Sequence, residues 1–335
     1  MKKRISNIEF LRILSMIMIV ISHISLYTNW EGISNLSPYS TVRLLGFDTL
    51  GPIGAVLFFM IPGFFARDYD VDKAIYKSLY KIKSVWIKTF LYSVCILFIC
   101  YLLSLTKIGL KKAVVAFFPF SFNEYWFVTA YILLILSSPF INYILFKCSE
   151  KQTNYLVLML FLLLFLELVN NSLVSRYFLA LESYIIGFKV NFYKEKINSY
   201  KWTIWLSLIA FCLIDVCTIY FSRAIGMEFS HSAHFTQYVL AVVIATFIFT
   251  LFSVTQPLYS KIINTLAKGM FAVYLVTSNP NFQDYFYNSI IQMNKYQDKF
   301  YLPLVEILVT ILICLFFGLL DVCLTSIFKI FKKVK

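Results

Sequence analysis

The chain has 335 residues, a formal net charge of +13 and 60% hydrophobic residues, and only 14% of its residues are charged. Soluble domains contain about 25% charged residues, so this composition excludes an ordinary soluble protein. No polar stretch of domain size interrupts the apolar pattern, and we therefore expect one membrane domain over residues 1–335. Positive charge is the orientation signal of a multi-pass membrane protein, so membrane lipids are expected as partners and nucleic acid is not.

Apolar stretches of membrane-spanning length recur along the whole chain. A spanning helix needs about 20 residues, and the candidates in chain order are 8–28, 44–66, 84–106, 125–146, 154–170, 173–188, 202–222, 235–254, 266–286 and 301–328. These ten stretches predict an all-α, polytopic integral membrane protein with about ten transmembrane helices. The sixth stretch is short, and the sequence SNPN interrupts the ninth.

The basic residues between these spans are distributed unevenly. If the N-terminus is cytoplasmic, most of the 30 lysines and arginines fall in cytoplasmic segments. Cytoplasmic loops of membrane proteins are enriched in these residues. We therefore predict that both termini lie in the cytoplasm.

The first span, IEFLRILSMIMIVISHI, carries Arg12 and His23, with Glu9 close by. Eleven residues of helix make about three turns, so Arg12 and His23 share one face about 16 Å apart, and Glu9 lies on the same stripe. Taken singly, Arg12 could reach the inner interface and pair with Glu9, and His23 could be a packing residue. Together they indicate a cavity or substrate path, in which a guanidinium binds phosphate and an imidazole transfers protons.

A second basic feature precedes the third span. Lys73, Lys77 and Lys81 recur every four residues, so a helix would align them as one stripe. This stripe could hold the phosphates of a coenzyme. The enrichment of cytoplasmic loops in lysine explains the same residues without any binding role.

Other polar and aromatic residues are candidates for lining the same site. Glu182 and Asp215 lie within predicted spans, where carboxylates usually face a cavity. Trp126 stands near the end of a span, where aromatic residues form an interfacial belt; stacking on a sugar ring is the alternative. His231 and His234 have a spacing that can hold a metal on a helix, but no third ligand is near in the sequence, so we expect no metal site.

Four further segments follow ISNIEFLRILSMIMIVISHI and its arginine–ten residues–histidine spacing. They are GPIGAVLFFMIPGFF, rich in glycine and phenylalanine; EYWFVTAYILLILSSPFI, with a Trp-Phe pair and a late proline; LESYIIGFKV, with Tyr-x-x-Gly; and KGMFAVYLVTSNPNF, with phenylalanine, tyrosine and leucine. In this order the five segments resemble the membrane-bound acyltransferase family three, which includes polysaccharide O-acetyltransferases. The resemblance extends from one end of the chain to the other.

The chain departs from the family pattern in three places. Pro62 stands where a serine is usual, and Thr277 stands where a histidine is frequent. The family often carries an arginine–two residues–arginine pair after the second span, whereas this region reads KSLYKIKSVWIK. Its charge comes from lysines 77, 81, 83 and 88.

The resemblance implies acyl transfer from a cytosolic acyl-CoA, first of all acetyl-CoA, to a hydroxyl of a glycan or lipid-linked saccharide in a bacterial plasma membrane. It implies His23 as the base or nucleophile and Arg12 as a donor-binding residue. Lys77 and Lys81 of the basic stripe are the further candidates for binding the donor's phosphates. Glu9 would orient Arg12. We expect no permanently bound cofactor. Because the chain ends directly after its last span, we expect it to act alone or to pass the acyl group to a separate protein.

The sequence pattern also fits a different class of membrane protein. A proton-coupled transporter or flippase of glycan precursors could use the face that carries Arg12 and His23 to move protons. A receptor or assembly partner is a further alternative, although it gives these two residues no role. Transfer from acetyl-CoA without any gradient would separate the enzyme from the transporter.

Overall fold

The computed structural model describes residues 5–120, 122, 124–166, 173–227 and 237–334. Within these ranges the chain forms helices and connecting turns and no strand, which confirms the all-α prediction. The long helices are α1 (Ser6–Tyr27), α3 (Leu50–Phe64), α4 (Val71–Leu102), α6 (Trp126–Lys147), α7 (Glu150–Leu166), α8 (Leu173–Asn198), α9 (Lys201–Ala224), α11 (Gln237–Val254), α12 (Lys261–Thr277) and α14 (Leu302–Val334). The short ones are η1 (Ile33–Asn35), α2 (Pro38–Leu45), α5 (Leu110–Phe117), α13 (Gln283–Tyr285), η2 (Phe286–Ile291) and η3 (Met293–Tyr296).

Six helical stretches of the described chain are long and apolar enough to cross a membrane. They are Ser6–Tyr27, Pro38–Phe64, Val71–Leu102, Trp126–Lys147, Lys201–Ala224 and Leu302–Ile327. The protein is therefore a multi-pass membrane protein. Each of the ten predicted spans overlaps a helix. The helices α7, α8, α11 and α12 lie outside this set of six, so ten crossings and the cytoplasmic placement of both termini stay predictions.

The predicted span 44–66 is not one continuous helix. It contains the end of α2, a turn, and the whole of α3. In the turn, the amide of Asp48 donates to the carbonyl of Leu45 at 2.9 Å. Ser22 on α1 donates to the carbonyl oxygen of Asp48 at 2.8 Å, so this carbonyl is satisfied outside the helix. The turn is thereby attached to α1.

The predicted span 266–286 is interrupted at the sequence SNPN, as expected, because α12 ends at Thr277. Beyond it, the side chain of Asn279 accepts a hydrogen bond from the amide of Asn281 at 2.9 Å. Pro280 lies between them and cannot donate a helical hydrogen bond. The chain therefore turns here, and the short elements α13 and η2 follow.

The helix α4 begins well before the predicted span 84–106. The side chain of Asp70 accepts hydrogen bonds from the amides of Asp72 (3.1 Å) and Lys73 (3.3 Å), which caps the helix start. The stretch from Val71 onward is therefore helical. The lysines at intervals of four lie on one stripe, as their spacing predicts.

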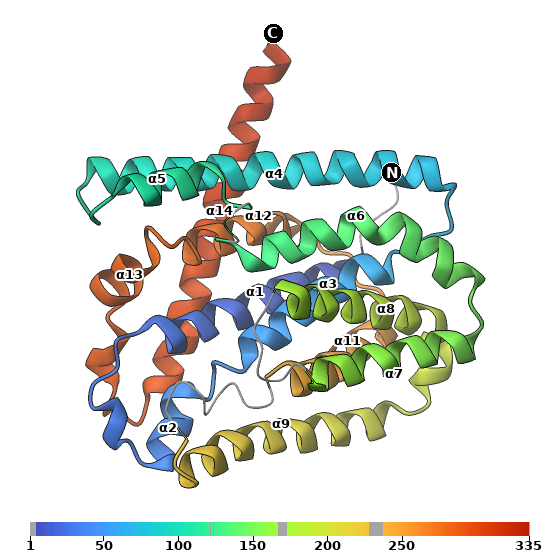
Figure 1. The fold of residues 1–335 in the computed structure, drawn as a ribbon, viewed down its shortest axis with the longest axis horizontal. Helices are drawn as coiled ribbons and strands as arrows, with labels where there is room; N and C mark the ends of the chain where they lie inside the picture. Colours follow the sequence, from blue (N-terminus) through green and yellow to red (C-terminus); the bar gives the residue numbers. More distant parts are fainter. Residues whose placement is uncertain (1–4, 121, 123, 167–172, 228–236, 335) are drawn as a thin grey trace.

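The helices α1, α3, α4, α6 and α8 run in similar directions, with each helix against a neighbour (Figure 1). Among the six apolar stretches, the one that contains α3 is the most buried, and α9 is the most exposed and lies at the edge of the bundle. The helix α3 packs most extensively against α8 and α1. The red helix α14 crosses this direction (Figure 1) and packs mainly on α12.

Glycines allow α3 and α8 to approach each other closely. A Cβ atom added at Gly63 would lie 1.9 Å from the carbonyl oxygen of Tyr184, and one added at Gly187 would lie 2.2 Å from that of Met60. Both obstacles are backbone atoms, which cannot rotate away. The Tyr-x-x-Gly segment is thus explained by helix packing.

We expect Gly187→Ala to lower the melting temperature of the protein purified in detergent. The added methyl group must push α8 away from α3, and overpacking of this kind destabilises by about 1–3 kcal/mol. Gly109→Ala is the matched control, because its added Cβ would have no atom within 4 Å. Equal melting temperatures for the two variants would contradict the close packing.

Candidate active site

The start of α1 is held in place by the segment between α11 and α12. The amide nitrogen of the Asn7 side chain donates to the hydroxyl of Thr255 at 2.7 Å, and its carbonyl oxygen accepts from the amide of Leu258 at 2.6 Å. The backbone amide of Ser6 donates to the carbonyl of Leu258 at 2.9 Å. These bonds fix the end of the helix that carries Arg12.

Arg12 pairs with Glu9 within α1. Its Nη1 lies 2.5 Å from Oε2 of Glu9, and the guanidinium lies 5.9 Å from the ring centre of Phe58 on α3. Glu9 is buried, whereas a quarter of the Arg12 side chain is exposed. The pair fixes one side of the guanidinium and leaves part of it accessible, and a supporting role for Glu9 stays a prediction.

A cavity of about 170 Å³ lies between the end of α3 and helices α4, α6 and α8. Lys77 and Lys81 both line it, so the structure brings the two predicted donor-binding lysines together. Arg67, which the sequence analysis did not select, lines it as well. The signal available in the sequence was its position as the first basic residue after the second span. Three cations around one cavity favour an anionic ligand.

Aromatic rings link this cavity to Arg12. The ammonium group of Lys81 lies 5.2 Å from the ring centre of Tyr131 on α6. The ring of Tyr131 lies 5.9 Å from that of Phe58, which is the ring beside Arg12. Arg12 and the lysine cavity are thus two parts of one region.

His23 lies further along α1, between two tyrosines. Its ring centre is 5.3 Å from that of Tyr27, on the next turn of α1, and 6.3 Å from that of Tyr274 on α12. The side chain is partly exposed, but its Nδ1 is buried and has no hydrogen-bond partner among the described residues. The neutral imidazole has one nitrogen that donates and one that accepts, so the hydrogen-bonding capacity of Nδ1 is unused here.

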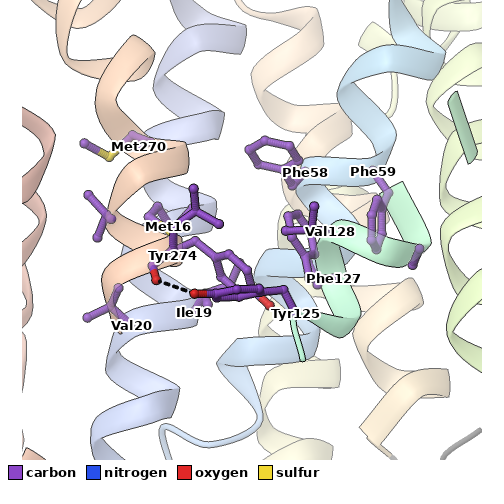
Figure 2. Close-up of a cluster of buried hydrophobic side chains, with 14 of the residues drawn as sticks. Met16, Ile19, Val20, Phe58, Phe59, Tyr125, Phe127, Val128, Met270 and Tyr274 are labelled. Carbon is purple, nitrogen blue, oxygen red and sulfur yellow. Dashed lines mark hydrogen bonds between the residues drawn. The ribbon is translucent and has the colours of Figure 1, made fainter. Parts of the chain in front are cut away.

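The face between Arg12 and His23 is tightly packed. Met16 and Ile19 lie there on α1, and both are buried. Figure 2 shows these residues beside the rings of Tyr274 and Phe127, with Phe58 and Phe59 on the neighbouring helix α3. The ring centre of Phe127 lies 5.2 Å from that of Phe58 and 5.1 Å from that of Tyr274. The structure therefore does not bring Arg12 and His23 into contact, and an aromatic layer separates them.

Residues near the start of α6 and α8 cover the His23 end of this layer. The guanidinium of Arg176 on α8 lies 5.1 Å from the ring centre of Trp126. The hydroxyl of Tyr125 donates to the carbonyl of Leu275 on α12 (Figure 2) and accepts from the side-chain amide of Asn279 at 2.6 Å. Trp126 thus lies beside Phe127 of the aromatic layer, at the end nearer His23, with the guanidinium of Arg176 over its ring.

Asp48 is a further residue of this end that the sequence analysis did not select. It is buried at the turn before α3, and its Oδ1 accepts a hydrogen bond from Ser22, the neighbour of His23, at 3.1 Å. Its charge and that of Arg176 both act on the hydroxyl of Tyr27. The short stretch FDTLG around Asp48 has no helical periodicity that would have indicated a functional residue.

The two predicted acidic residues lie in different places. Asp215 on α9 is buried beside the hydroxyl of Thr49, at the same turn as Asp48. Glu182 on α8 is buried, and neither of its carboxyl oxygens has a hydrogen-bond partner among the described residues. Neither residue has a recorded contact with His23, so a role for them in the site stays a prediction. His231 and His234 lie outside the described residues.

Glu124 precedes Tyr125 and has a half-buried side chain whose Oε2 lacks a partner among the described residues. Burial raises the pKa of the Glu124 carboxyl to about 7 from its ordinary value of 4.5. The folded protein therefore binds this proton more tightly than the unfolded chain does between these two pH values. The stability it contributes is complete below pH 4.5 and is lost as the pH rises to about 7.

We therefore expect Glu124→Gln to raise the melting temperature relative to the wild type at pH 8 and to have a smaller effect at pH 5. Gln keeps the shape of the side chain and removes the ionisation. Thermal melts of the purified protein in detergent at the two pH values measure this difference. A difference between variant and wild type that does not depend on pH would contradict the raised pKa.

Two of three comparisons with known proteins found nothing: no curated protein and no solved structure matches the chain. A family described as an acyltransferase domain matches residues 5–326, which is nearly the whole chain. This match confirms the resemblance drawn from the five ordered segments. The chain belongs to the membrane-bound acyltransferase family 3 and is a membrane acyltransferase.

Proposed function

We propose that this acyltransferase moves an acetyl group from cytosolic acetyl-CoA to a hydroxyl of a cell-envelope or exported polysaccharide, with His23 as the catalytic base. The observation that carries the proposal is the environment of His23. Its Nδ1 is buried and has no described partner, and its ring lies between Tyr27 and Tyr274. A histidine used only for packing would usually have this nitrogen hydrogen-bonded.

The chemistry needs one proton acceptor beside the attacking hydroxyl. The neutral imidazole of His23 takes the proton of the sugar hydroxyl as its oxygen attacks the thioester carbonyl carbon. The carbon–sulfur bond then breaks, and the imidazolium returns the proton to the departing thiolate. The products are the sugar ester and free coenzyme A. Every atom and the proton are accounted for without a bound cofactor.

The cavity around Lys77 and Lys81 supports a binding site for the phosphates of the donor. Arg67 adds a third cation. Arg12 lies outside the cavity and is linked to Lys81 through two rings, those of Tyr131 and Phe58. Lysine and arginine bind phosphate through charge-assisted hydrogen bonds. In this arrangement the nucleotide part of the donor stays at the cytoplasmic end, and Arg12 meets the arm that carries the acyl group.

The packed layer between Arg12 and His23 lies across the path that the donor must take. The acyl-bearing arm of coenzyme A has to pass Met16, Ile19 and the rings of Phe127 and Tyr274 to reach the imidazole. Side chains of this layer must therefore move when the donor binds. The acceptor meets the acyl group at the other end, beside Trp126 and Arg176, whose ring and charge suit a saccharide.

We expect His23→Ala to lower the transfer of labelled acetyl groups about 10²–10⁴-fold, the usual contribution of a general base. The assay uses inside-out vesicles with acetyl-CoA outside, and labelled glycan is expected in the lumen. Leu26→Ala is the matched control, because Leu26 is an exposed apolar residue on the next turn of α1. Both variants are compared at equal membrane levels.

Two results would contradict this proposal. One is wild-type activity in His23→Ala, and the other is labelled product confined to the vesicle exterior. Adding an uncoupler, which removes the proton gradient, distinguishes an enzyme from a proton-coupled transporter. Transfer by the enzyme persists without a gradient, whereas a proton-coupled transporter stops.

We expect the double variant Lys77→Gln/Lys81→Gln to raise KM for acetyl-CoA by up to about thirtyfold, which corresponds to about 2 kcal/mol for two pairs, and to leave kcat nearly unchanged. An exposed ion pair contributes up to about 1 kcal/mol, and donor binding is lost without any change at His23. Lys196→Gln is the control, because Lys196 is an exposed lysine near the end of α8 and does not line the cavity. A fall in kcat with an unchanged KM would contradict a donor-binding role.

A further inference from the structure

A groove of about 820 Å³ lies between α4 and α14, apart from the residues used for acyl transfer. On α4 its lining follows one stripe from Tyr80 to Cys100, at intervals of three and four residues. Twenty residues of helix extend about 30 Å, which is the thickness of the hydrocarbon core of a bilayer. The groove therefore follows α4 over a length comparable to this thickness, with a polar end at Lys83 and Ser84.

The wall of the groove is apolar over most of this length. Leu91, Cys95 and Ile99 line it from α4, and Phe317 and Leu320 line it from α14. The remaining lining residues of this kind are Ile87, Ile96, Val276, Phe282 and Leu324.

One ion pair joins the two helices inside the groove. Nζ of Lys88 lies 2.7 Å from Oδ2 of Asp321, and the hydroxyl of Tyr92 donates to Oδ1 of Asp321 at 2.8 Å. These charges neutralise each other, so this depth of the groove does not repel an apolar chain.

One end of the groove is polar and positively charged. Lys83 is exposed there and has no ion-pair partner among the described residues, and Ser84 and Thr325 line the same end with hydroxyl groups. By the distribution of basic residues along the chain this end is cytoplasmic. The structure thus combines a lone cation and hydroxyl groups at the inner interface with an apolar track leading from them into the membrane.

We propose that this groove binds an anionic phospholipid of the cytoplasmic leaflet. Its phosphate binds Lys83 with the hydroxyls of Ser84 and Thr325, and one acyl chain follows the apolar stripe past Lys88 and Asp321. The cytoplasmic leaflet is the one that carries anionic lipids. The bound chain fills the space between α4 and α14, which otherwise meet through the bonds to Asp321, and so holds α14 against the bundle.

The sequence alone grouped Lys83 with Lys77 and Lys81 as one basic segment. The structure divides them, because Lys77 and Lys81 line the cavity beside α6 and α8, whereas Lys83 and Lys88 line this groove. The binding of a structural lipid is thus independent of the binding of the acyl donor. The two roles are separable by mutation.

The test uses the full-length protein and phosphatidylglycerol with a photoreactive group on its acyl chain. Cross-links are expected on α4 between Leu91 and Ile99 and on α14 near Leu320, and unlabelled phosphatidylglycerol should compete far better than phosphatidylcholine. Lys83→Gln should lower the labelling about fivefold, the contribution of one lysine near an anionic lipid surface. Lys196→Gln, outside the groove, should leave it unchanged.

A second pair of variants tests the apolar track. Leu91→Trp places a bulky ring in the groove and should abolish the cross-links, whereas Leu102→Trp changes an exposed apolar residue of the same helix outside the groove and should not. Equal competition by phosphatidylcholine, or equal labelling of Lys83→Gln and Lys196→Gln, would overturn the proposal. So would disulfide-linked dimers formed through Cys95, because a second copy of the chain would then occupy the groove.

Discussion

The separation of Arg12 and His23 along one rigid helix is the constraint on which the site depends. The helix α1 sets them about 16 Å apart on one face, and its start is held by the bonds of Ser6 and Asn7 to the segment before α12. A cation at one depth and an unpartnered imidazole at another suit a reaction whose two substrates approach from opposite sides. In the proposed reaction the donor's phosphates bind at the Arg12 end of this helix and the acceptor hydroxyl meets His23 at the other end.

The packing around α1 determines how these two ends communicate. The helix α3 also approaches α1 closely, because a Cβ atom at Gly54 would lie 2.5 Å from the carbonyl oxygen of Ser15, and Phe58 one turn later lies beside Arg12. From there the rings of Phe127 and Tyr274 continue to His23. Stacked and tilted rings exclude water without filling the space as rigidly as backbone does. This layer separates the Arg12 end of the face from the His23 end.

The lysines of α4 illustrate why the role of a charged residue in a membrane protein has to be inferred from its neighbours. Lysines that lie close together in the sequence have different neighbours in the structure. Lys81 lies over Tyr131 in the cavity beside α6, Lys88 is neutralised by Asp321, and Lys83 has no described ion partner in the groove beside α14. Orientation in the membrane accounts for the common sign of their charge. Their neighbours determine what each lysine can bind.

The sequence by itself determined the all-α membrane class, the family, and the shared face of Arg12 and His23, because helical periodicity and apolar length are local properties. Only the tertiary structure decided that Lys77 and Lys81 share a cavity with Arg67, that Lys83 faces another groove, and that Asp48 and Arg176 lie near His23. It also showed the division of the span 44–66, where the turn before α3 is bonded to Ser22 of α1. Contacts between residues far apart in the chain leave no periodic signal, which is why these features appeared only when the helices packed.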